Sequence, residues 1–411
     1  MPRRQPAQPA PVASESQNRP SDYVNVAHII TRLIIGGAQE NTILTCRGLV
    51  ERGHRVTLIA GPETGAEGSL WEQAKASGCD LVRLDPLRRA IHPVHDLRAF
   101  HRLEELLRDM RTDVVHTHSS KAGIIGRTAA AKAGVPVVVH TIHGMSFNRT
   151  QSAVAQAVYR ALERYAARYT TGFIAVADSM IDQAVAAGLG ARHRFVTIRS
   201  GLDTGLFAPR AERRREHRAR WGVSDADVVV GTIARLFANK GYDEIIAAMP
   251  LIAARSPAVR FVWIGDGRDR GAYERMVERI GLRECVTLLG LLNPAEVAEA
   301  INGFDIILHA SRWEGLPRAI VQGLLTEVPA VSFDNDGAPE VVIDGQTGRL
   351  VPYGDIQALA DAVSDLACDA PLRRKLGARG RDVCLRDFDW HVMVDRIEEY
   401  YQQLRRQDAK A

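Results

Sequence analysis

The 411-residue sequence lacks the features that mark several large classes of protein. Its five cysteines are scattered and form no C-x-x-C pair, so the sequence predicts neither a zinc knuckle nor a disulfide framework, and a reducing cytoplasm is the expected location. Basic and acidic residues number 53 and 49, a balance that argues against a protein that coats nucleic acid. No apolar run is long enough for a membrane-spanning helix, so any membrane contact is expected to be peripheral, at the inner face.

The first 22 residues combine five prolines with Gln, Ala and Ser, and they contain no continuous apolar stretch of the kind found in signal peptides. We expect residues 1–22 to form a disordered tail. The remaining length suits two domains of about 150 to 200 residues each. From Asn25 onward a short apolar strand, a glycine-containing turn and an amphipathic segment alternate in both halves, which predicts a wound α/β architecture.

Strands are predicted where apolar residues form short runs. In the first half these runs cover residues 26–33, 55–60, 113–116, 136–141, 172–176 and 195–198. In the second half they cover residues 228–234, 260–264, 286–289, 306–309 and 330–333. The near-continuous Val content of residues 135–139 favours parallel strands that are covered on both faces.

Residues 200–222 separate the two halves and contain a basic run, which comprises Arg210, Arg213, Arg214, Arg215, Arg218 and Arg220. We place the domain boundary in this segment, between domains at residues 23–200 and 223–389. The favoured interpretation of the run is a solvated helix between the lobes. The alternative is contact with an anionic membrane surface or an acidic acceptor.

Near the C-terminus, apolar and aromatic residues recur at helical spacing, namely Trp390, Met393, Val394, Ile397, Tyr400, Tyr401 and Leu404. This pattern predicts an amphipathic helix whose apolar stripe packs on another element.

The segment from residue 311 to residue 322 follows a buried-looking strand and opens a helix. Gly315 lets the backbone come close to a ligand, and the free N–H groups of a helix start favour a phosphate or a sugar hydroxyl. The carboxylate of Glu314 can accept hydrogen bonds from sugar hydroxyls. Gln322 lies eight positions later, near the same helical face, and can reach another part of one ligand. A simple helix-terminal charge is the alternative for Glu314.

Arg235 ends another apolar strand, and Lys240 and Gly241 follow after a short loop. The planar guanidinium and the mobile ammonium can together hold a diphosphate. In a sugar transfer, fixed cations at this place stabilise the negative charge of the departing nucleoside diphosphate, so no metal is required. For each of these residues taken alone, the alternative is an exposed side chain that binds no ligand.

Three further segments carry weaker signals. Gly36 and Gly37 form a glycine loop before a helix, which lets backbone N–H groups approach phosphate, although an ordinary turn is an equal alternative. Histidines at two strand ends, His116, His118, His140 and His143, would reach the ligand-binding edge of a parallel sheet. Zinc is a minor interpretation of these four, and satisfaction by backbone groups is the commoner one for His116 and His140. The pair Asp334 and Asp336 is a minor candidate for holding a divalent cation.

From residue 24 to residue 404 the order of these segments resembles that of the family 4 retaining glycosyltransferases, of the group 1 type. The family pattern has an early Gly-Gly loop, an H-T-x-H strand end, R-L-x-x-x-K-G, a G-D-G turn and Glu-x7-Glu. The matching segments here are residues 36–37, 140–143, 235–241, 265–267 and 314–322. No single segment is specific, but five in the same order are.

The resemblance implies a GT-B fold, in which two Rossmann-like domains face each other across a cleft and a C-terminal helix, residues 390–411, crosses back to the first domain. Residues 23–200 would form the acceptor side, and residues 223–389 would bind a nucleotide sugar. The acceptor would be an unidentified glycan or lipid-linked molecule, in polysaccharide or glycolipid assembly. No cofactor and no metal are expected.

The resemblance also assigns roles to residues. Arg235 and Lys240 would bind the diphosphate, Glu314 would contact the sugar and stabilise positive character at its anomeric carbon, and His143 would lie beside the reacting sugar. The remaining donor-binding residues would be Gly36, Gly37, Gly315, Leu316 and Gln322. Gln322 departs from the family pattern, in which a second glutamate bonds the ribose hydroxyls, and an amide does so without charge assistance.

The resemblance further implies that the transfer retains the anomeric configuration and that the leaving phosphate takes the acceptor's proton, so no dedicated protein base is expected. Two alternatives remain open at the level of sequence. One is a sugar-nucleotide epimerase of the same fold, and the other is a non-catalytic donor-binding subunit. A nicotinamide dehydrogenase is disfavoured because the GxGxxG fingerprint is missing.

Overall fold

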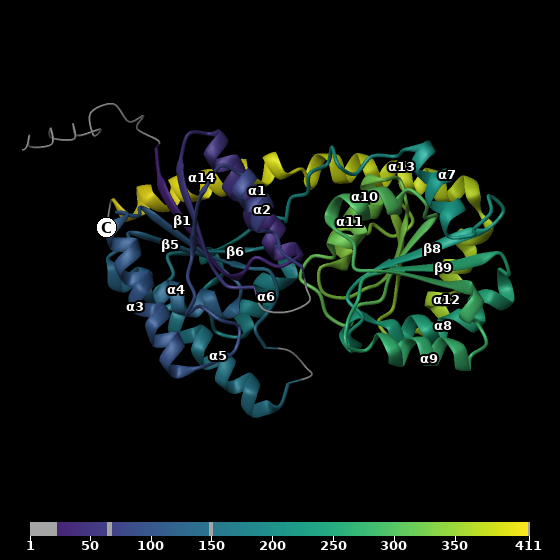
Figure 1. Ribbon diagram of the computed structural model, residues 1–411, viewed down its shortest axis with the longest axis horizontal. Helices are drawn as coiled ribbons and strands as arrows, with labels where there is room; N and C mark the ends of the chain where they lie inside the picture. The colour runs from purple at the N-terminus through teal and green to yellow at the C-terminus, as the bar shows by residue number, and fades with distance from the viewer. Residues whose placement is uncertain (1–22, 64–67, 148–150, 410–411) are drawn as a thin grey trace, which may run out of the picture.

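The computed structural model describes residues 23–63, 68–147 and 151–409. These residues form two lobes, each built on one parallel sheet that is covered by helices (Figure 1). The wound α/β architecture predicted from the sequence is therefore confirmed. The predicted tail, residues 1–22, lies outside the described residues. No helix among the described residues is long and apolar enough to cross a bilayer.

The first lobe contains a seven-stranded sheet with the order β3-β2-β1-β4-β5-β6-β7, in which all neighbours are parallel. Its strands are β1 (Asn25–Arg32), β2 (Arg55–Gly61), β3 (Asp80–Arg83), β4 (Val114–His118), β5 (Val137–Ile142), β6 (Gly172–Ala175) and β7 (Phe195–Thr197). Its helices are α1 (Gly37–Glu51), α2 (Trp71–Ala76), α3 (Pro93–Asp109), α4 (Ser120–Ala133), α5 (Ala153–Ala167) and α6 (Asp178–Ala186).

The second lobe contains a six-stranded parallel sheet with the order β10-β9-β8-β11-β12-β13. Its strands are β8 (Val228–Ile233), β9 (Val259–Ile264), β10 (Val286–Gly290), β11 (Ile306–His309), β12 (Ala330–Phe333) and β13 (Gly348–Val351). Its helices are α7 (Ala211–Arg220), α8 (Tyr242–Arg255), α9 (Arg270–Arg279), α10 (Pro294–Ile301), α11 (Arg318–Leu325), α12 (Ile356–Cys368) and α13 (Ala370–Asp387).

The sequence pattern missed two strands, β3 and β13, which both lie at the edge of a sheet. None of the four residues of β3 is buried, and only the two ends of β13 are buried. Edge strands that are not covered on both faces do not need the continuous apolar run that marks a buried parallel strand in a sequence.

The chain crosses between the lobes twice at the same place. Leu202 donates a backbone hydrogen bond to the carbonyl of Phe388 at 2.9 Å, and Trp390 donates one to the carbonyl of Leu202 at 3.1 Å. Asp389 then caps the last helix, α14 (Trp390–Asp408), by accepting from the backbone N–H of His391 at 2.8 Å.

Helix α14 packs against α1 of the first lobe and runs along the top of Figure 1 in yellow. All seven residues of its predicted stripe are buried, and they belong to the same core cluster as β1 and α1. The predicted crossing of the C-terminal helix back to the first lobe is therefore confirmed.

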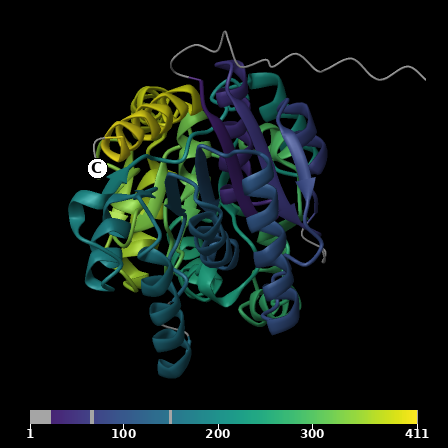
Figure 2. The same cartoon turned by 90° about the vertical axis from the view of Figure 1, so that its left-hand side faces the viewer.

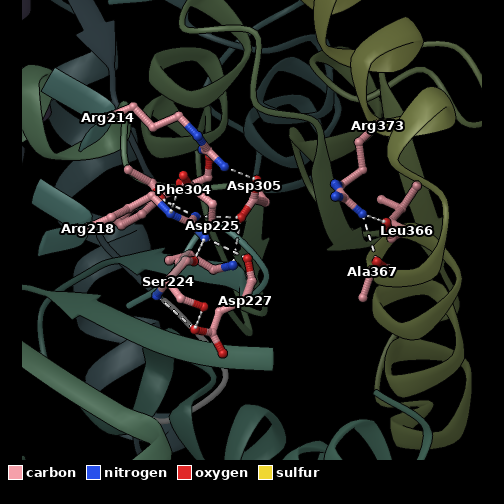
Figure 3. A network of polar contacts seen from close by, with 12 residues as sticks. Arg214, Arg218, Ser224, Asp225, Asp227, Phe304, Asp305, Leu366, Ala367 and Arg373 are labelled. Carbon is pink, nitrogen blue, oxygen red and sulfur yellow. Dashed lines mark hydrogen bonds and ion pairs between the residues drawn. The ribbon is translucent and has the colours of Figure 1, made fainter. Parts of the chain in front are cut away.

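The basic run forms α7, and the interpretation as a solvated helix between the lobes is wrong for two of its arginines. Arg214 and Arg218 turn into the second lobe and bond the carboxylate of Asp305 at 2.7 and 2.9 Å (Figure 3). Arg218 is only 2% exposed and also donates to the carbonyls of Ser224 and Asp227. The run is therefore partly structural, because only some of its arginines, such as Arg215, face solvent.

Candidate active site

Lys240 and Glu314 form an ion pair at the carboxyl ends of two neighbouring strands of the second lobe. Lys240 lies on the loop after β8, Glu314 lies on the loop between β11 and α11, and Nζ of Lys240 is 2.6 Å from Oε2 of Glu314. Each side chain is about one fifth exposed. The parallel pairing of β8 with β11 brings the two loops together, although they are about 70 residues apart in the sequence.

The carboxylate of Glu314 is held in its charged form. Burial alone would raise the pKa of Glu314, but the Lys240 ammonium, with a smaller contribution from His309, outweighs burial and lowers the pKa below its ordinary value. Asp336 fixes the same loop, because its Oδ2 accepts a hydrogen bond from the backbone N–H of Glu314 at 2.9 Å. The pair is therefore charged and positioned before any ligand arrives.

The start of α11 lies against the first lobe. A Cβ atom added to Gly315 would lie 2.3 Å from the carbonyl oxygen of His143, so only glycine permits this approach. In the described part of the chain, the N–H groups of Gly315 and Leu316 donate to no protein group, whereas the side chain of Leu316 is buried in the core. Two backbone donors are thus free to meet a ligand at the start of a helix.

The loop of Gly36 and Gly37 faces two arginines of the second lobe. Nη2 of Arg235 donates to the carbonyl of Ile35 at 3.1 Å, and a Cβ added to Gly37 would lie 2.5 Å from the side chain of Arg318. The loop therefore approaches Arg235 and also Arg318, a cation that the sequence pattern did not identify.

Arg318 joins the two lobes. Its Nη2 lies 2.9 Å from Oε2 of Glu40 on α1, and its Nη1 donates to the carbonyl of Gly201 at 2.9 Å. Its charge also acts on the neighbouring His143, whose pKa burial lowers to about 3 with Arg318 as the second cause. Its place at the start of α11, four residues after Glu314, is the signal in the sequence that could have identified Arg318.

The predicted histidines divide into two groups. Alternation along β5 turns His140 to one face of the sheet, where its Nδ1 lies 2.9 Å from Oγ1 of Thr117, and turns Thr141 to the other. On that other face, His116 bonds Tyr401 at 2.5 Å and Thr141 at 2.6 Å. The partners of His116 are therefore side chains, not the backbone groups that were expected.

The donor nitrogens of His28, His116 and His118 lie within 4.8 Å of one another, which is a spacing that a metal ion can use. Both ring nitrogens of His116 are already hydrogen-bonded to side chains. Of the four predicted histidines, only His116 and His118 belong to this trio, so the four do not form one cluster. Burial lowers the pKa of all three clustered histidines, so they are uncharged at neutral pH.

Two other predicted residues have defined places. The side chain of Gln322 lies on α11, nearly buried, and its amide makes no hydrogen bond within the described residues. Asp336 uses one oxygen for the N–H of Glu314 and the other for the side chain of Gln183 on α6, at 3.2 Å. Asp336 therefore positions a loop and ties the two lobes together, whereas Asp334 is exposed.

We call the group formed by Arg235, Lys240, Glu314, Arg318 and the Gly36-Gly37 loop the interlobe site. It combines three cations, one fixed carboxylate and free helix-start N–H groups between two Rossmann-like lobes. This arrangement can bind a diphosphate beside a hydroxyl-rich group. Fold and site together define the class of GT-B sugar-transferring proteins.

Comparison with known proteins agrees with this class. Residues 36–201 match the family described as glycosyl transferase 4-like domain, and residues 213–383 match glycosyl transferases group 1. A GDP-mannose-dependent alpha-mannosyltransferase of Mycobacterium tuberculosis is 30% identical over 74% of this chain and 76% of its own length. The chain belongs to this family of glycosyltransferases.

Two further similarities extend over nearly the whole chain. A UDP-Gal:alpha-D-GlcNAc-diphosphoundecaprenol alpha-1,3-galactosyltransferase of Escherichia coli is 26% identical over 92% of this chain and 96% of its own length. The crystal structure of Anabaena HepE in complex with UDP and glucose superposes with a TM-score of 0.80, at 20% identity, over 93% of this chain and all of HepE. The predicted GT-B fold is thereby confirmed.

Proposed function

We propose that this glycosyltransferase moves a hexose from a nucleoside diphosphate sugar to a glycan or lipid-linked acceptor, with retention of anomeric configuration and without a metal. The observation that carries the proposal is the pair of Lys240 and Glu314 at 2.6 Å, beside the free N–H groups at the start of α11. The HepE crystal structure contains UDP and glucose, and the E. coli relative is named for a UDP-galactose donor, which supports this class of donor.

The charges of the interlobe site suit the departure of a diphosphate. As the bond to the anomeric carbon breaks, negative charge gathers on the leaving phosphate, and the cations Arg235, Lys240 and Arg318 stabilise it from fixed positions. Because these three charges supply the stabilisation that a divalent cation would give, we propose that transfer needs no metal. Transfer should then continue in the presence of a chelator.

The carboxylate of Glu314 has a second role in this proposal. It stays ionised beside Lys240, so it can accept hydrogen bonds from the sugar and stabilise positive character at the anomeric carbon. The acceptor hydroxyl attacks from the same face that the phosphate leaves, and its proton goes to the leaving phosphate oxygen. The amide of Gln322 bonds the ribose hydroxyls.

The test is consumption of nucleotide sugars against a panel of acceptors, with and without EDTA, by the wild type, Lys240→Ala and Glu314→Ala. We expect turnover by the wild type in both conditions and strongly reduced turnover by both variants. Equal rates in all three proteins would reject the site. Conversion of the donor to another sugar without acceptor would support an epimerase, and tight nucleotide binding without turnover would support a donor-binding subunit.

We further propose that the enzyme works at an anionic membrane surface, on the cytoplasmic side, where a lipid-linked acceptor is presented. The support is the apolar stripe of α5, formed by Val154, Val158, Leu162 and Tyr165, which are 74, 51, 38 and 48% exposed. Helix α5 projects from the first lobe in both overall views (Figures 1 and 2). The E. coli relative is named for a diphosphoundecaprenol-linked acceptor.

The charges of α5 suit contact with an anionic membrane surface. Its exposed charged residues, Arg160, Arg164 and Arg168 at its end, are all basic. Its single acid, Glu163, is buried in an ion pair with Arg127 at 2.5 Å. A helix with an apolar face and basic flanks binds best to an anionic lipid surface.

A further inference from the structure

A chain of hydrogen-bonded histidines runs from the core of the first lobe to the interlobe site. Nδ1 of His28 lies 3.0 Å from Nε2 of His118, and Nδ1 of His118 lies 3.1 Å from Nε2 of His143. The three residues come from β1, the end of β4 and the loop after β5. His28 and His118 are fully buried, whereas His143 is partly exposed and lies beside Gly315, in the loop that leads into α11.

The register of the sheet produces this chain. His28 on β1 pairs with His116 on β4, and alternation along β4 turns His118 to the same face as His116. His118 in turn pairs with Thr141 on β5, two residues before His143. His28 and His118 are therefore fixed by paired strands, and His143 directly follows the third strand, β5.

Each of these imidazoles is neutral, because burial lowers the pKa of all three. A neutral imidazole has one N–H and one acceptor nitrogen, so the two hydrogen bonds must point in the same direction along the chain. Two arrangements exist. The protons lie either all on Nδ1, pointing toward the interlobe site, or all on Nε2, pointing into the core.

The inner end of the chain decides between the two arrangements. Nε2 of His28 is buried and has no hydrogen-bond partner in the described residues. Protons on Nε2 would leave a buried N–H without an acceptor, whereas protons on Nδ1 leave only an unused lone pair. In folded proteins a buried N–H without an acceptor is rarer than a buried acceptor without a donor. The arrangement with protons on Nδ1 is therefore favoured.

We propose that His28 and His118 are positioning residues, which hold His143 with its proton on Nδ1 so that it donates a hydrogen bond to a sugar oxygen of the bound donor. The inference rests on the proposed function for the identity of the ligand. Nε2 of His143 faces His118, so Nδ1 is the ring nitrogen that remains for a ligand. The carbonyl of the same residue approaches Gly315, next to Glu314.

The first experiment reads the tautomer directly, by NMR of the full chain with ring-labelled histidines at neutral pH. His143→Gln assigns the signals of His143. We expect Nδ1 of His143 to carry the proton in the wild type, and His118→Leu to shift the proton toward Nε2. His140→Asn is the matched control, because His140 is a buried histidine outside the chain, and it should leave the signals of His143 unchanged.

The second experiment measures whether the donated bond matters for the reaction. The wild type should prefer the intact donor over one of its monodeoxy analogues by about two- to tenfold in kcat/KM, the value of one hydrogen bond. His118→Leu should remove this preference, and His118→Asn, whose amide N–H can replace the Nδ1–H, should restore part of it. A purely structural role would lower both rates equally.

A wild-type His143 with its proton on Nε2, or a tautomer that His118→Leu leaves unchanged, would overturn the inference. Micromolar binding of zinc by the wild type that is lost in His28→Gln would also overturn it, because the metal would replace the bond between His28 and His118. The NMR result needs no substrate, so failure of every donor in the transfer assay would reject the proposed function and leave the tautomer measurement standing.

Discussion

Oε2 of Glu314 lies 2.6 Å from Nζ of Lys240, and the two residues come from separate loops of the second lobe. This contact makes the protonation of the carboxylate depend on a cation from another segment of the chain. Burial favours the neutral acid, and Lys240 reverses that preference. The pH dependence of the reaction should therefore report on this ion pair of the interlobe site.

Replacing Lys240 by Met should move the acidic limb of the kcat/KM profile to higher pH. Glu314 has a lowered pKa, so its charged form is lost only as the pH falls through that value, and without Lys240 the pKa rises because burial acts unopposed. The maximal rate should fall by roughly 10²- to 10³-fold, as for other fixed groups that stabilise developing charge. Lys240→Arg keeps the charge and should keep the limb in place. If the acidic limb does not shift in Lys240→Met, it does not report the ionisation of Glu314 beside Lys240.

Gly315→Ala should separate the lobes without unfolding either of them. The new Cβ would lie 2.3 Å from the carbonyl of His143 and 3.3 Å from Val176, so the loop must move. Misplacement of about 1 Å lowers rates by about 10²-fold, which is the expected loss in kcat/KM. Gly144→Ala is the control, since its Cβ would meet no atom within 4 Å. Equal activity of both variants would show that the close approach is not needed.

Arg318→Gln should weaken donor binding and open the molecule. It removes the ion pair with Glu40 at 2.9 Å and a cation of the proposed diphosphate site. We expect the donor KM to rise about tenfold and the radius of gyration in X-ray scattering to increase. Glu40→Gln removes the ion pair alone and should reproduce the opening with a smaller change in KM. Arg255→Gln, in an exposed pair with Asp361, should change neither.

Arg218→Ala should destabilise the second lobe by about 3 kcal/mol, because it unpairs buried groups. Its guanidinium bonds Asp305 and the carbonyls of Ser224 and Asp227, as Figure 3 shows. Urea unfolding followed by fluorescence would measure the change. Arg215→Ala on the same helix is exposed and should stay within about 0.5 kcal/mol of the wild type. A similar small change for Arg218→Ala would show that the buried network contributes little.

Val158→Asp should reduce sedimentation with vesicles that contain phosphatidylglycerol, because it places a charge in the apolar stripe of α5. Leu385→Asp, at a site on α13 that is 40% exposed, should bind as the wild type does. Vesicles of phosphatidylcholine alone should bind neither protein strongly. If Val158→Asp instead changes the molar mass measured by light scattering, the stripe joins two copies of the chain and does not bind lipid.

Much of the fold was predictable because buried parallel strands have a strong local signal. The Val-rich run before His140 and the stripe from Trp390 to Leu404 each indicate burial without knowledge of their partners. The edge strands β3 and β13 were missed because they are not covered on both faces and lack that signal. The contacts of Arg214 and Arg218 were not predictable because a run of arginines gives no indication that Asp305, about 90 residues later, will bond two of them and that one of them will be buried.

The sequence predicts binding roles for Arg235, Lys240 and Glu314 because in each segment a charged side chain coincides with the end of a strand, and the structure brings Lys240 and Glu314 together. Contacts that depend on pairing between distant strands were not predictable in this way. His28 is a single histidine in an apolar strand and carries no signal in the sequence, and only the register with β4 places it beside His118. The role of Arg318 is not visible in its own segment because it depends on Glu40 in the other lobe.

The double crossing at Leu202 and Phe388 means that the second lobe is, in topology, an insertion within the first. The first lobe is completed only by α14, whose Tyr401 bonds His116. Residues 23–200 alone therefore lack the seven buried side chains of α14 that complete their core. A chimera that exchanges sugar-nucleotide specificity between relatives should replace residues 203–388 as one segment with two junctions. With a single junction, α14 would come from one protein and the first lobe on which it packs from the other.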